Sequence, residues 1–349
     1  DDAQLDGLGT DQLQALATGQ IMALGTSQIA GLSTDQIVAL TSAQALVLSS
    51  AQVGALDTAQ VAAIETADLA VLGTAALRAL ASDDIAALTS DQVVALTGNQ
   101  VASLSSAQLD GLGSDQLAVL ETADLRQLGT AQLRSLTSAQ LDGLTSDQIQ
   151  SLSTAQVAGL STDQIATLAT DDLAVLTSAQ VRALSSAQIG ALTTAQVAAL
   201  ETEDFATLTT VQLRALASDD VAAFTTDQIV ALSSTQVASL STAQVAGLSS
   251  DQIAAMQTDD LRALSTLSLR ALSDTQLGGL TSDQLQALSL TQVAALTTDQ
   301  VNSLSTANIA LLTSDQVRSL SSTQVAALST DQVVALETGD LAAMSTVQL

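Results

Sequence analysis

Leucine returns at every eighth position of this 349-residue chain, starting at Leu8. Only Ile64, Phe224, Met256 and Met344 interrupt the series, and each of them is also apolar. The chain therefore contains 43 complete octads and the fragment 345–349, with no insertion or deletion between them. We number the places of each octad 1 to 8, so that Leu occupies place 8. Such a period predicts a repeat protein in which each unit buries its apolar side chains against its neighbours.

The other places of the octad indicate which secondary structure repeats. Place 5 is Val, Ile or Leu except at Ala45 and Phe205, and place 7 is mostly Ala, Gly or Ser. A continuous helix would spread the Leu series around its surface, because eight residues exceed two helical turns by about 80°. On a short helix places 5 and 8 are neighbours on one face, whereas in a strand they point to opposite faces. We therefore predict an all-α solenoid or superhelix of very short helices, one per octad, with a β-solenoid as the alternative.

Each octad also carries its own helix-start signal. Place 4 is Gln in 33 octads of 44, and it follows a Ser, Thr, Gly or Asp at place 1 in most of them. Ser161 with Gln164 has the spacing of a capping box, and Leu160 with Ile165 has that of a hydrophobic staple. Sixteen Asp residues occupy place 3, where the helix dipole favours an anion, and all eight Arg occupy place 6. These signals predict a helix of about two turns that is broken and restarted in every octad.

One such helix is too short to be stable alone, so neighbouring octads must share a core. We expect residues 1–349 to form a single continuous octad-repeat solenoid. Small residues at place 7 would let adjacent helices approach closely. The period by itself leaves open how many octads make one superhelical turn. Since the chain opens in register at Asp1 and stops within an octad at Leu349, we expect a mature piece or a fragment of something longer.

Eight octads replace the place-4 Gln by Asp, and their place-1 residues are Glu, Ala or Gln, which are poor helix caps. These two places therefore vary together, as a contact between them requires. Asp68, Asp204 and Asp340 are 136 residues apart, as are Asp84 with Asp220 and Asp124 with Asp260, so the chain contains a 136-residue higher-order duplication. One hypothesis is that Asp caps a shifted helix start and forms a different corner. The other is duplicated ancestry without structural meaning.

The composition excludes several kinds of chemistry. The chain has no His, Cys, Trp or Tyr, its eight basic residues are all Arg, and its formal net charge is −28. A nucleophilic Ser would lack a His or Lys base, and no imidazole or thiolate is present to bind zinc, haem or an iron–sulfur cluster. The negative charge opposes binding to nucleic acid. We predict that the chain is not an enzyme, assign no catalytic, cofactor-binding or metal-binding residue, and expect no cofactor and no nucleic-acid partner.

The sequence also bears on three further kinds of partner: a membrane, calcium and a flat ligand. No apolar stretch approaches the roughly 20 residues of a membrane span, so we expect no membrane insertion. Asp oxygens suit calcium, but the spacing of a calcium loop is absent, and dipole stabilisation accounts for the place-3 Asp residues; calcium stays open without an assigned ligand. The Gln residues at place 4 either form an exposed array for a flat ligand such as ice or a glycan, or serve as caps. Their variation with place 1 favours caps.

Units such as Leu-Thr-Thr-Asp-Gln-Val at 296–301 and Leu-Ser-Thr-Ala-Gln-Val at 240–245 resemble a known kind of array. They look like the Leu-[Ser/Thr]-x-x-Gln-[Val/Ile] octapeptide tandem repeats of very large secreted or surface bacterial proteins, which are often described as adhesin-like. The resemblance covers the whole chain and brings no catalytic or binding residues with it. It implies a structural repeat region located outside the cell or on its surface.

We therefore predict an extended acidic stalk, spacer or fibre segment, in which acidity keeps an apolar-cored rod soluble. Self-association or a protein partner is left open. The alternative is an acidic interaction module or a DNA-mimicking solenoid. Such a mimic should concentrate its Asp residues on one face, whereas a stalk should spread them. The place-3 Asp residues are spread along the sequence, which favours the stalk.

Overall fold

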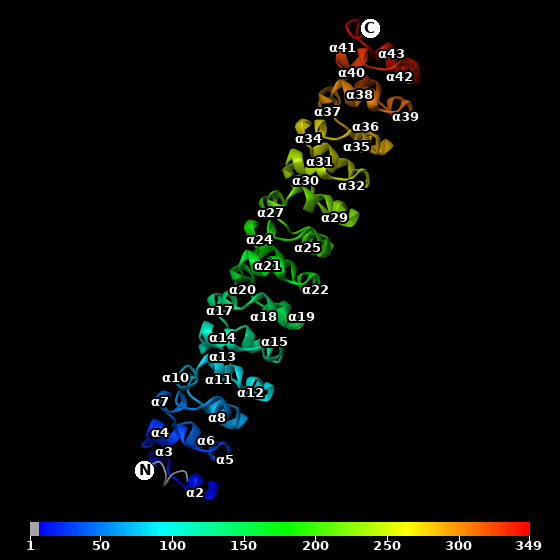
Figure 1. The fold of residues 1–349 in the computed structure, drawn as a ribbon. Helices are drawn as coiled ribbons and strands as arrows, with labels where there is room; N and C mark the ends of the chain where they lie inside the picture. The colour runs from blue at the N-terminus through cyan, green and yellow to red at the C-terminus, as the bar shows by residue number, and fades with distance from the viewer. Residues whose placement is uncertain (1–6) are drawn as a thin grey trace. The chain divides into compact units, whose positions relative to one another are not determined.

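The computed structural model describes residues 7–349. The chain forms two compact units, Asp1–Leu176 and Thr177–Leu349, and each is considered by itself. Between residues 7 and 349 every regular element is a short helix and none is a strand (Figure 1). The prediction of an all-α solenoid with one helix per octad is confirmed, and the β-solenoid alternative is wrong. A single continuous array over residues 1–349 stays a prediction.

The helices of the first unit are α2 (Thr10–Gln14), α3 (Thr18–Met22), α4 (Thr26–Ala30), α5 (Thr34–Val38), α6 (Ser42–Ala45), α7 (Ser50–Val53), α8 (Thr58–Ala62), α9 (Thr66–Val71), α10 (Thr74–Leu77), α11 (Ser82–Ala86), α12 (Ser90–Ala95), α13 (Gly98–Ser103), α14 (Ser106–Gly111), α15 (Ser114–Ala118), α16 (Thr122–Leu125), α17 (Thr130–Ser135), α18 (Ser138–Asp142), α19 (Ser146–Ser151), α20 (Thr154–Gly159), α21 (Thr162–Thr167) and α22 (Thr170–Ala174).

The helices of the second unit are α23 (Ser178–Ala183), α24 (Ser186–Ile189), α25 (Thr194–Ala199), α26 (Thr202–Phe205), α27 (Thr210–Ala215), α28 (Ser218–Ala222), α29 (Thr226–Ala231), α30 (Ser234–Ser239), α31 (Thr242–Gly247), α32 (Ser250–Ala255), α33 (Thr258–Ala263), α34 (Thr266–Arg270), α35 (Asp274–Gly278), α36 (Ser282–Ala287), α37 (Leu290–Ala295), α38 (Thr298–Ser303), α39 (Thr306–Ala310), α40 (Ser314–Ser319), α41 (Ser322–Ala326), α42 (Thr330–Ala335) and α43 (Thr338–Ala343).

Each helix occupies places 2 to 7 of its octad at most, which is shorter than the two turns predicted. The reason is an extended step of two residues between helices. In α12, Thr89 precedes the helix at φ −72°, ψ 160°, and Leu96 follows it at φ −62°, ψ 136°. No residue in the described part of the chain has a positive φ. The step therefore needs no glycine, and the branched or bulky residues of places 8 and 1 can form it.

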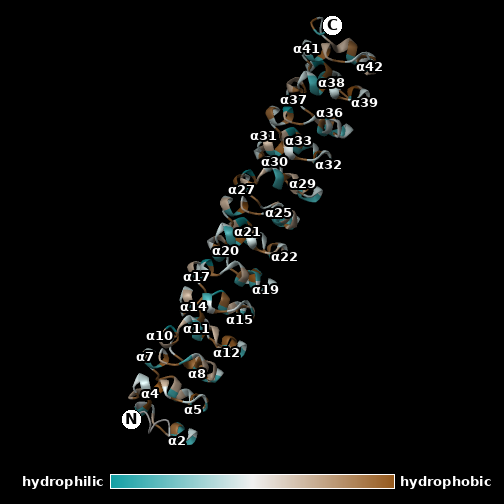
Figure 2. Cartoon of the chain, in the orientation of Figure 1, coloured by the Kyte–Doolittle hydropathy of each residue, from teal (hydrophilic) through white to brown (hydrophobic). Residues whose placement is uncertain are grey.

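The core of each unit consists of the side chains at places 5 and 8. Nearly all of them are buried, from Leu13 in the first unit to Leu320 in the second. The predicted staple residues, Leu160 and Ile165, are both in this core. Hydrophobic and hydrophilic residues alternate along every part of both units, with no separate apolar region (Figure 2). The octad pattern thus predicted the buried face correctly.

Helices three octads apart pack side by side, as α11 does with α14 and α28 with α31. The place-7 residue of the later helix contacts the place-2 residue of the earlier one. A Cβ atom added at Gly111 in α14 would lie 2.5 Å from the backbone oxygen of Ser82 in α11. A Cβ added at Gly143 would lie 2.5 Å from the Cβ of Ser114, and one at Gly159 would lie 2.8 Å from the Cβ of Thr130. The prediction that small place-7 residues allow close approach is confirmed.

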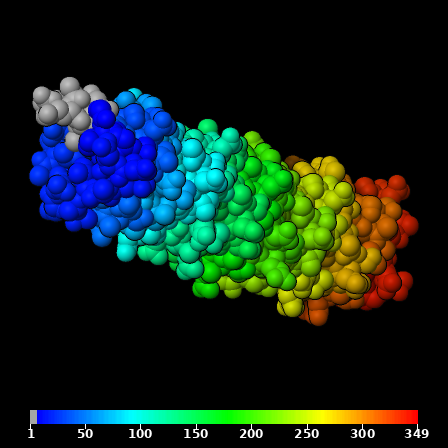
Figure 3. All heavy atoms as spheres, turned by 90° about the horizontal axis from the view of Figure 1, so that it is seen from below, coloured from blue at the N-terminus to red at the C-terminus, as the bar shows by residue number. Residues whose placement is uncertain are grey.

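The helix three octads away is the packing partner, while the helix end four octads away bonds to the place-4 side chain, as described below. One turn of the coil therefore takes between three and four octads, a quantity that the period alone left open. Within the face shown in Figure 3, the atoms of successive octads of each unit follow one another in chain order without a gap. Each unit is a stack of such turns (Figure 1).

Candidate functional site: the place-4 side chains

The place-4 glutamines form the predicted capping boxes. In octad 161–168, Gln164 Oε1 accepts a hydrogen bond from the backbone N–H of Ser161 at 2.8 Å, and Ser161 Oγ accepts one from the N–H of Gln164 at 3.1 Å. The second unit repeats this arrangement with Ser241 and Gln244. These bonds satisfy backbone donors that the first helical turn leaves free. The capping interpretation of place 4 is confirmed.

The other end of the same amide joins two turns of the coil. Gln164 Nε2 donates to the carbonyl oxygens of Leu133 at 3.0 Å and Leu136 at 2.8 Å, which belong to the octad four units earlier. Gln244 Nε2 likewise donates to Leu213 and Leu216, both at 2.8 Å. One side chain thus caps the start of its own helix and the end of another. Sequence reasoning missed this second role, although one signal was present: place 4 is never Glu, which could accept but not donate.

Most place-4 glutamines are buried, so they are not an exposed surface. The alternative in which they bind a flat ligand such as ice or a glycan is therefore wrong for the Gln positions in the interior of each unit. The amide oxygen and the amide nitrogen of an interior Gln, such as Gln164, both have hydrogen-bond partners within the array, which agrees with the rule that buried polar groups are paired.

The eight Asp octads begin their helices at place 2 like all others, as α9 and α11 show. The hypothesis of a shifted helix start is therefore wrong. Where Ala occupies place 1, the carboxylate can replace the Gln amide as acceptor: Asp84 Oδ2 accepts from the N–H of Ala81 at 2.9 Å, and Asp220 Oδ2 from that of Ala217 at 3.1 Å. The shorter, donor-free Asp cannot supply the bond that Gln Nε2 makes to the turn four octads earlier.

A second group of Asp octads makes a different contact between turns. The hydroxyl of Ser42 donates to Asp68 Oδ1 at 2.6 Å, and that of Ser314 donates to Asp340 Oδ1 at 2.7 Å. Ser178 donates to Asp204 in the same way. Each of these three bonds joins place 2 to the place-4 Asp three octads later, and each recurs after 136 residues. At Asp68, Asp204 and Asp340 the duplication therefore preserves a tertiary contact, which contradicts the hypothesis of no structural meaning for this set. Ser234 bonds to Asp260 in the same way at 2.6 Å, but the residue equivalent to Ser234 before Asp124 is Gly98, which has no hydroxyl.

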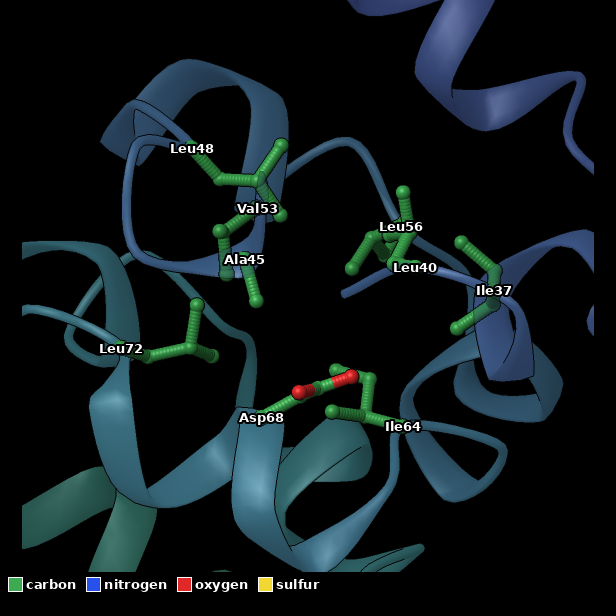
Figure 4. A pocket seen from close by; sticks show the side chains of 9 residues that line it. All are labelled: Ile37, Leu40, Ala45, Leu48, Val53, Leu56, Ile64, Asp68 and Leu72. Atoms are coloured by element: carbon green, nitrogen blue, oxygen red, sulfur yellow. The ribbon is translucent and has the colours of Figure 1, made fainter. Parts of the chain in front are cut away.

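Asp68 lies beside a small internal cavity of about 10 Å³. Its carboxyl group points among aliphatic side chains, and the side chain is only 4% exposed (Figure 4). The cavity is lined by Ile37, Leu40, Ala45, Leu48, Val53, Leu56, Ile64, Asp68 and Leu72. A space of this size holds about one water molecule. A Gln in place of Asp68 would extend into this cavity toward the carbonyl groups of the octad 33–40.

Three of the place-4 carboxyl groups have raised pKa values. Burial is the main cause for Asp124, Asp172 and Asp220. Neighbouring acids add to it: Glu121 for Asp124, Asp142 and Asp171 for Asp172, and Asp219 for Asp220. The N–H of Ala217 acts in the opposite direction on the pKa of Asp220. These shifts follow from packing a carboxylate where an uncharged amide usually lies.

Among residues 7–349, no group of three or more acidic side chains is arranged to hold a metal ion. Within the same part of the chain, no helix has both the length and the apolar character needed to cross a bilayer.

A family model described as the ALTTAQ repeat matches residues 15–48, 61–98, 117–154, 165–202, 197–234, 230–258, 253–290 and 306–338. The matches cover more than half of the chain. The six residues of that description occur as Ala191 to Gln196, and they span the extended step and the start of α25 through its place-4 Gln. No curated protein matches the sequence.

Proposed function

This chain belongs to the ALTTAQ repeat family of tandem-repeat proteins, and from that premise we propose that it serves as an extended acidic stalk, spacer or fibre segment of a large bacterial surface or secreted protein. The observation that carries the proposal is the use of nearly every interior place-4 amide to join turns of the coil. Gln148 and Gln300, for example, each connect their octad to the carbonyl groups of the octad four units earlier. An array built in this way lengthens by adding octads.

The surface chemistry supports the same role. Apart from the place-4 Asp residues, which are buried or half-buried, the acidic side chains of the described part of the chain are exposed, and like charge along a surface opposes lateral aggregation. The proposal assigns no catalytic residue and no cofactor to the chain. Its biological location outside the cell or on the surface follows from the resemblance to adhesin-like arrays and belongs to the proposal.

Small-angle X-ray scattering of the full chain tests the stalk. A compact globule of this length would have a radius of gyration of about 20 Å. We expect a clearly larger value and a pair-distance distribution with the long tail of an elongated particle. A compact distribution would overturn the proposal. The location is tested separately by treating intact cells that produce the native protein with protease, since a surface protein should be degraded while a cytoplasmic marker survives.

A second function, binding of a basic partner or mimicry of DNA, is favoured by the placement of charge in the first unit. Six of its eight place-3 Asp residues lie on α2, α5, α12, α15, α19 and α22, which follow one side of that unit with α8 (Figure 1). We name this set the acidic edge; it consists of Asp11, Asp35, Asp91, Asp115, Asp147 and Asp171. All six are exposed. The place-3 Asp residues of this unit are spread along the sequence, but most of them lie on helices of one side.

The acidic edge has a matched control in the same chain. Asp83, Asp163, Asp219, Asp259, Asp299 and Asp315 also occupy place 3 and are exposed, but they lie on other helices. Changing either set to Asn removes the same number of charges. If the chain mimics DNA, it should inhibit DNA gyrase in competition with duplex DNA, and the acidic-edge variant should lose that inhibition more than the control variant. Equal effects of the two variants, or no inhibition at all, would leave the stalk as the function.

A further inference from the structure

The place-8 carbonyl oxygen four octads before an Asp octad lacks the donor that a place-4 Gln supplies elsewhere. In an ordinary octad of the second unit, Gln244 Nε2 donates to Leu216 O at 2.8 Å. The corresponding oxygen before Asp260 is Leu232 O, which accepts no hydrogen bond from any residue between 7 and 349. Leu232 is only 2% exposed. Because buried carbonyl groups are nearly always paired, this oxygen needs a donor other than a Gln side chain.

Asp260 itself has an unused acceptor. Its Oδ1 accepts from the hydroxyl of Ser234 at 2.6 Å, but its Oδ2 is buried and has no hydrogen-bond partner in the described part of the chain. The side chain is 4% exposed. At place 1 of the same octad, Gln257 Nε2 donates to Val230 O at 3.1 Å, so one carbonyl group of the earlier octad has regained a donor. Two acceptors are left, Asp260 Oδ2 and Leu232 O.

The lengths of the Asp and Gln side chains set the gap between these two acceptors. Asp is one methylene shorter than Gln, so its outer oxygen should end about 1.5 Å before the position that a Gln Nε2 reaches. The Leu232 oxygen should then lie about 4–5 Å away, which is too far for a direct hydrogen bond. One water molecule spans such a gap, because its two O–H groups can each donate to an acceptor about 2.8 Å from the water oxygen.

The first unit contains the space that such a molecule needs. Asp68 Oδ1 accepts from Ser42 at 2.6 Å, as Asp260 Oδ1 does from Ser234. Leu40, whose carbonyl oxygen accepts no hydrogen bond from residues 7–349, lines the same cavity of about 10 Å³ as the Asp68 side chain (Figure 4). A cavity of this size holds about one water molecule, and a buried water needs at least two polar partners. The Asp68 carboxylate and the Leu40 carbonyl group can provide these two partners.

We propose that Asp68 and Asp260 each bind one internal water molecule, which donates one O–H to the carboxylate and the other to the place-8 carbonyl oxygen four octads earlier. The water supplies the donor that the Gln amide supplies in other octads, so the two turns stay joined through it. Calcium does not suit these sites, because it takes about six to eight oxygen ligands, and among residues 7–349 no group of three or more acidic side chains is arranged to hold a metal ion.

A crystal structure of the full chain at atomic resolution tests the proposal. We expect density for one water oxygen at about 2.8 Å from both Asp260 Oδ2 and Leu232 O, and for another between Asp68 and Leu40 O. Crystals grown in RbCl distinguish a water from a monovalent cation, since rubidium at the site would give an anomalous peak. Such a peak, an absence of density at either site, or a carboxyl oxygen in direct contact with the carbonyl oxygen would each overturn the proposal.

Magnetic relaxation dispersion of water oxygen-17 tests the same site in solution, because it counts long-lived internal waters. The double variant Gln257→Ser, Asp260→Gln restores the usual capping box, whose amide supplies the donor, so it should hold one long-lived water fewer than the wild type. Asp259→Gln is the matched control, because it makes the same change at the exposed neighbouring place 3 and should keep the wild-type number. Circular dichroism checks that both variants are folded. An unchanged number of waters in the double variant would contradict the proposal.

Discussion

At the scale of single residues, the place-4 side chain determines how two turns of the coil are joined. Glutamine is the side chain that accepts at the helix start and donates to the helix end four octads earlier, as Gln164 does. Asp can replace only the acceptor, as where it accepts from the hydroxyl of Ser42 at Asp68 or from the N–H of Ala81 at Asp84. The residue type at place 4 therefore depends on which hydrogen-bond donors and acceptors its side chain provides, rather than on its helix propensity.

Replacing Gln164 by Glu should lower the free energy of unfolding at pH 7 by about 2–3 kcal/mol, because the buried carbonyls of Leu133 and Leu136 lose their donor and face a carboxylate. Chemical denaturation measures this change. The loss should shrink at low pH, where a protonated Glu can donate. The control is Asn302→Asp, the same amide-to-acid change at an exposed place 6. Equal losses in the two variants would contradict the role of the amide donor.

Asp172→Asn tests the effect of a buried carboxyl group on stability against pH. Burial, with Asp142 and Asp171, raises the pKa of Asp172 above its ordinary value of 3.8. The folded state then holds this proton more tightly than the unfolded state, so the stability due to Asp172 is present at low pH and is lost as pH rises through the folded pKa. The Asn variant should melt at a higher temperature than the wild type at pH 7 and show little difference near pH 3.5. A difference that is the same at both pH values would argue against this cause.

At the scale of elements, each helix is short because two extended residues follow it. It is stable because neighbouring helices cover its apolar side chains. Close approach of helices three octads apart depends on place 7, where Gly111 meets the backbone of Ser82. Phe205 and Phe224 show that two residues in contact can differ together between the duplicated segments. Their rings meet edge to face with centroids 4.7 Å apart, and both equivalent positions 136 residues earlier, Leu69 and Leu88, are Leu.

Gly111→Ala should destabilise the protein by about 1–3 kcal/mol, because the new Cβ would lie 2.5 Å from the Ser82 oxygen and force the two helices apart. Gly278→Ala is the control. It lies at the end of α35 with no atom within 4 Å of the added Cβ, so we expect a gain of about 0.5–1 kcal/mol. Thermal melting followed by circular dichroism gives both signs. Destabilisation of both variants to the same degree would refute the close-approach argument.

Leu160→Asp should destabilise the first unit by about 4 kcal/mol, because it removes a buried aliphatic side chain and puts a charge in its place. Ala158→Asp, two residues away at an exposed place 6, should change the free energy of unfolding by less than about 0.5 kcal/mol. Equal melting temperatures for the two variants would show that the faces of the octad are assigned incorrectly.

At the scale of the whole molecule, the chain combines an aliphatic core with a net charge of −28. Repulsion between like charges disfavours the compact state, and salt screens it. We therefore expect the melting temperature to rise by several degrees between 10 mM and 0.5 M NaCl, with minima at 208 and 222 nm in the circular dichroism spectrum throughout. A melting temperature that falls over this range would mean that attractive charge pairs dominate.

The eight-residue period by itself determined the class of fold, the start of each helix and its buried face, because these depend on spacings of three or four residues within an octad. Ser161 with Gln164 and Leu160 with Ile165 could be assigned from such spacing. The tertiary structure decided the coil of between three and four octads per turn, the bond from Gln164 to Leu133 and Leu136, and the contact of Ser42 with Asp68. It also decided that the acidic edge lies on one side of the first unit. These features depend on residues 24 or more positions apart in the sequence. Which of these residues meet is set by how whole turns of the coil pack, and residue spacing within one octad does not determine it.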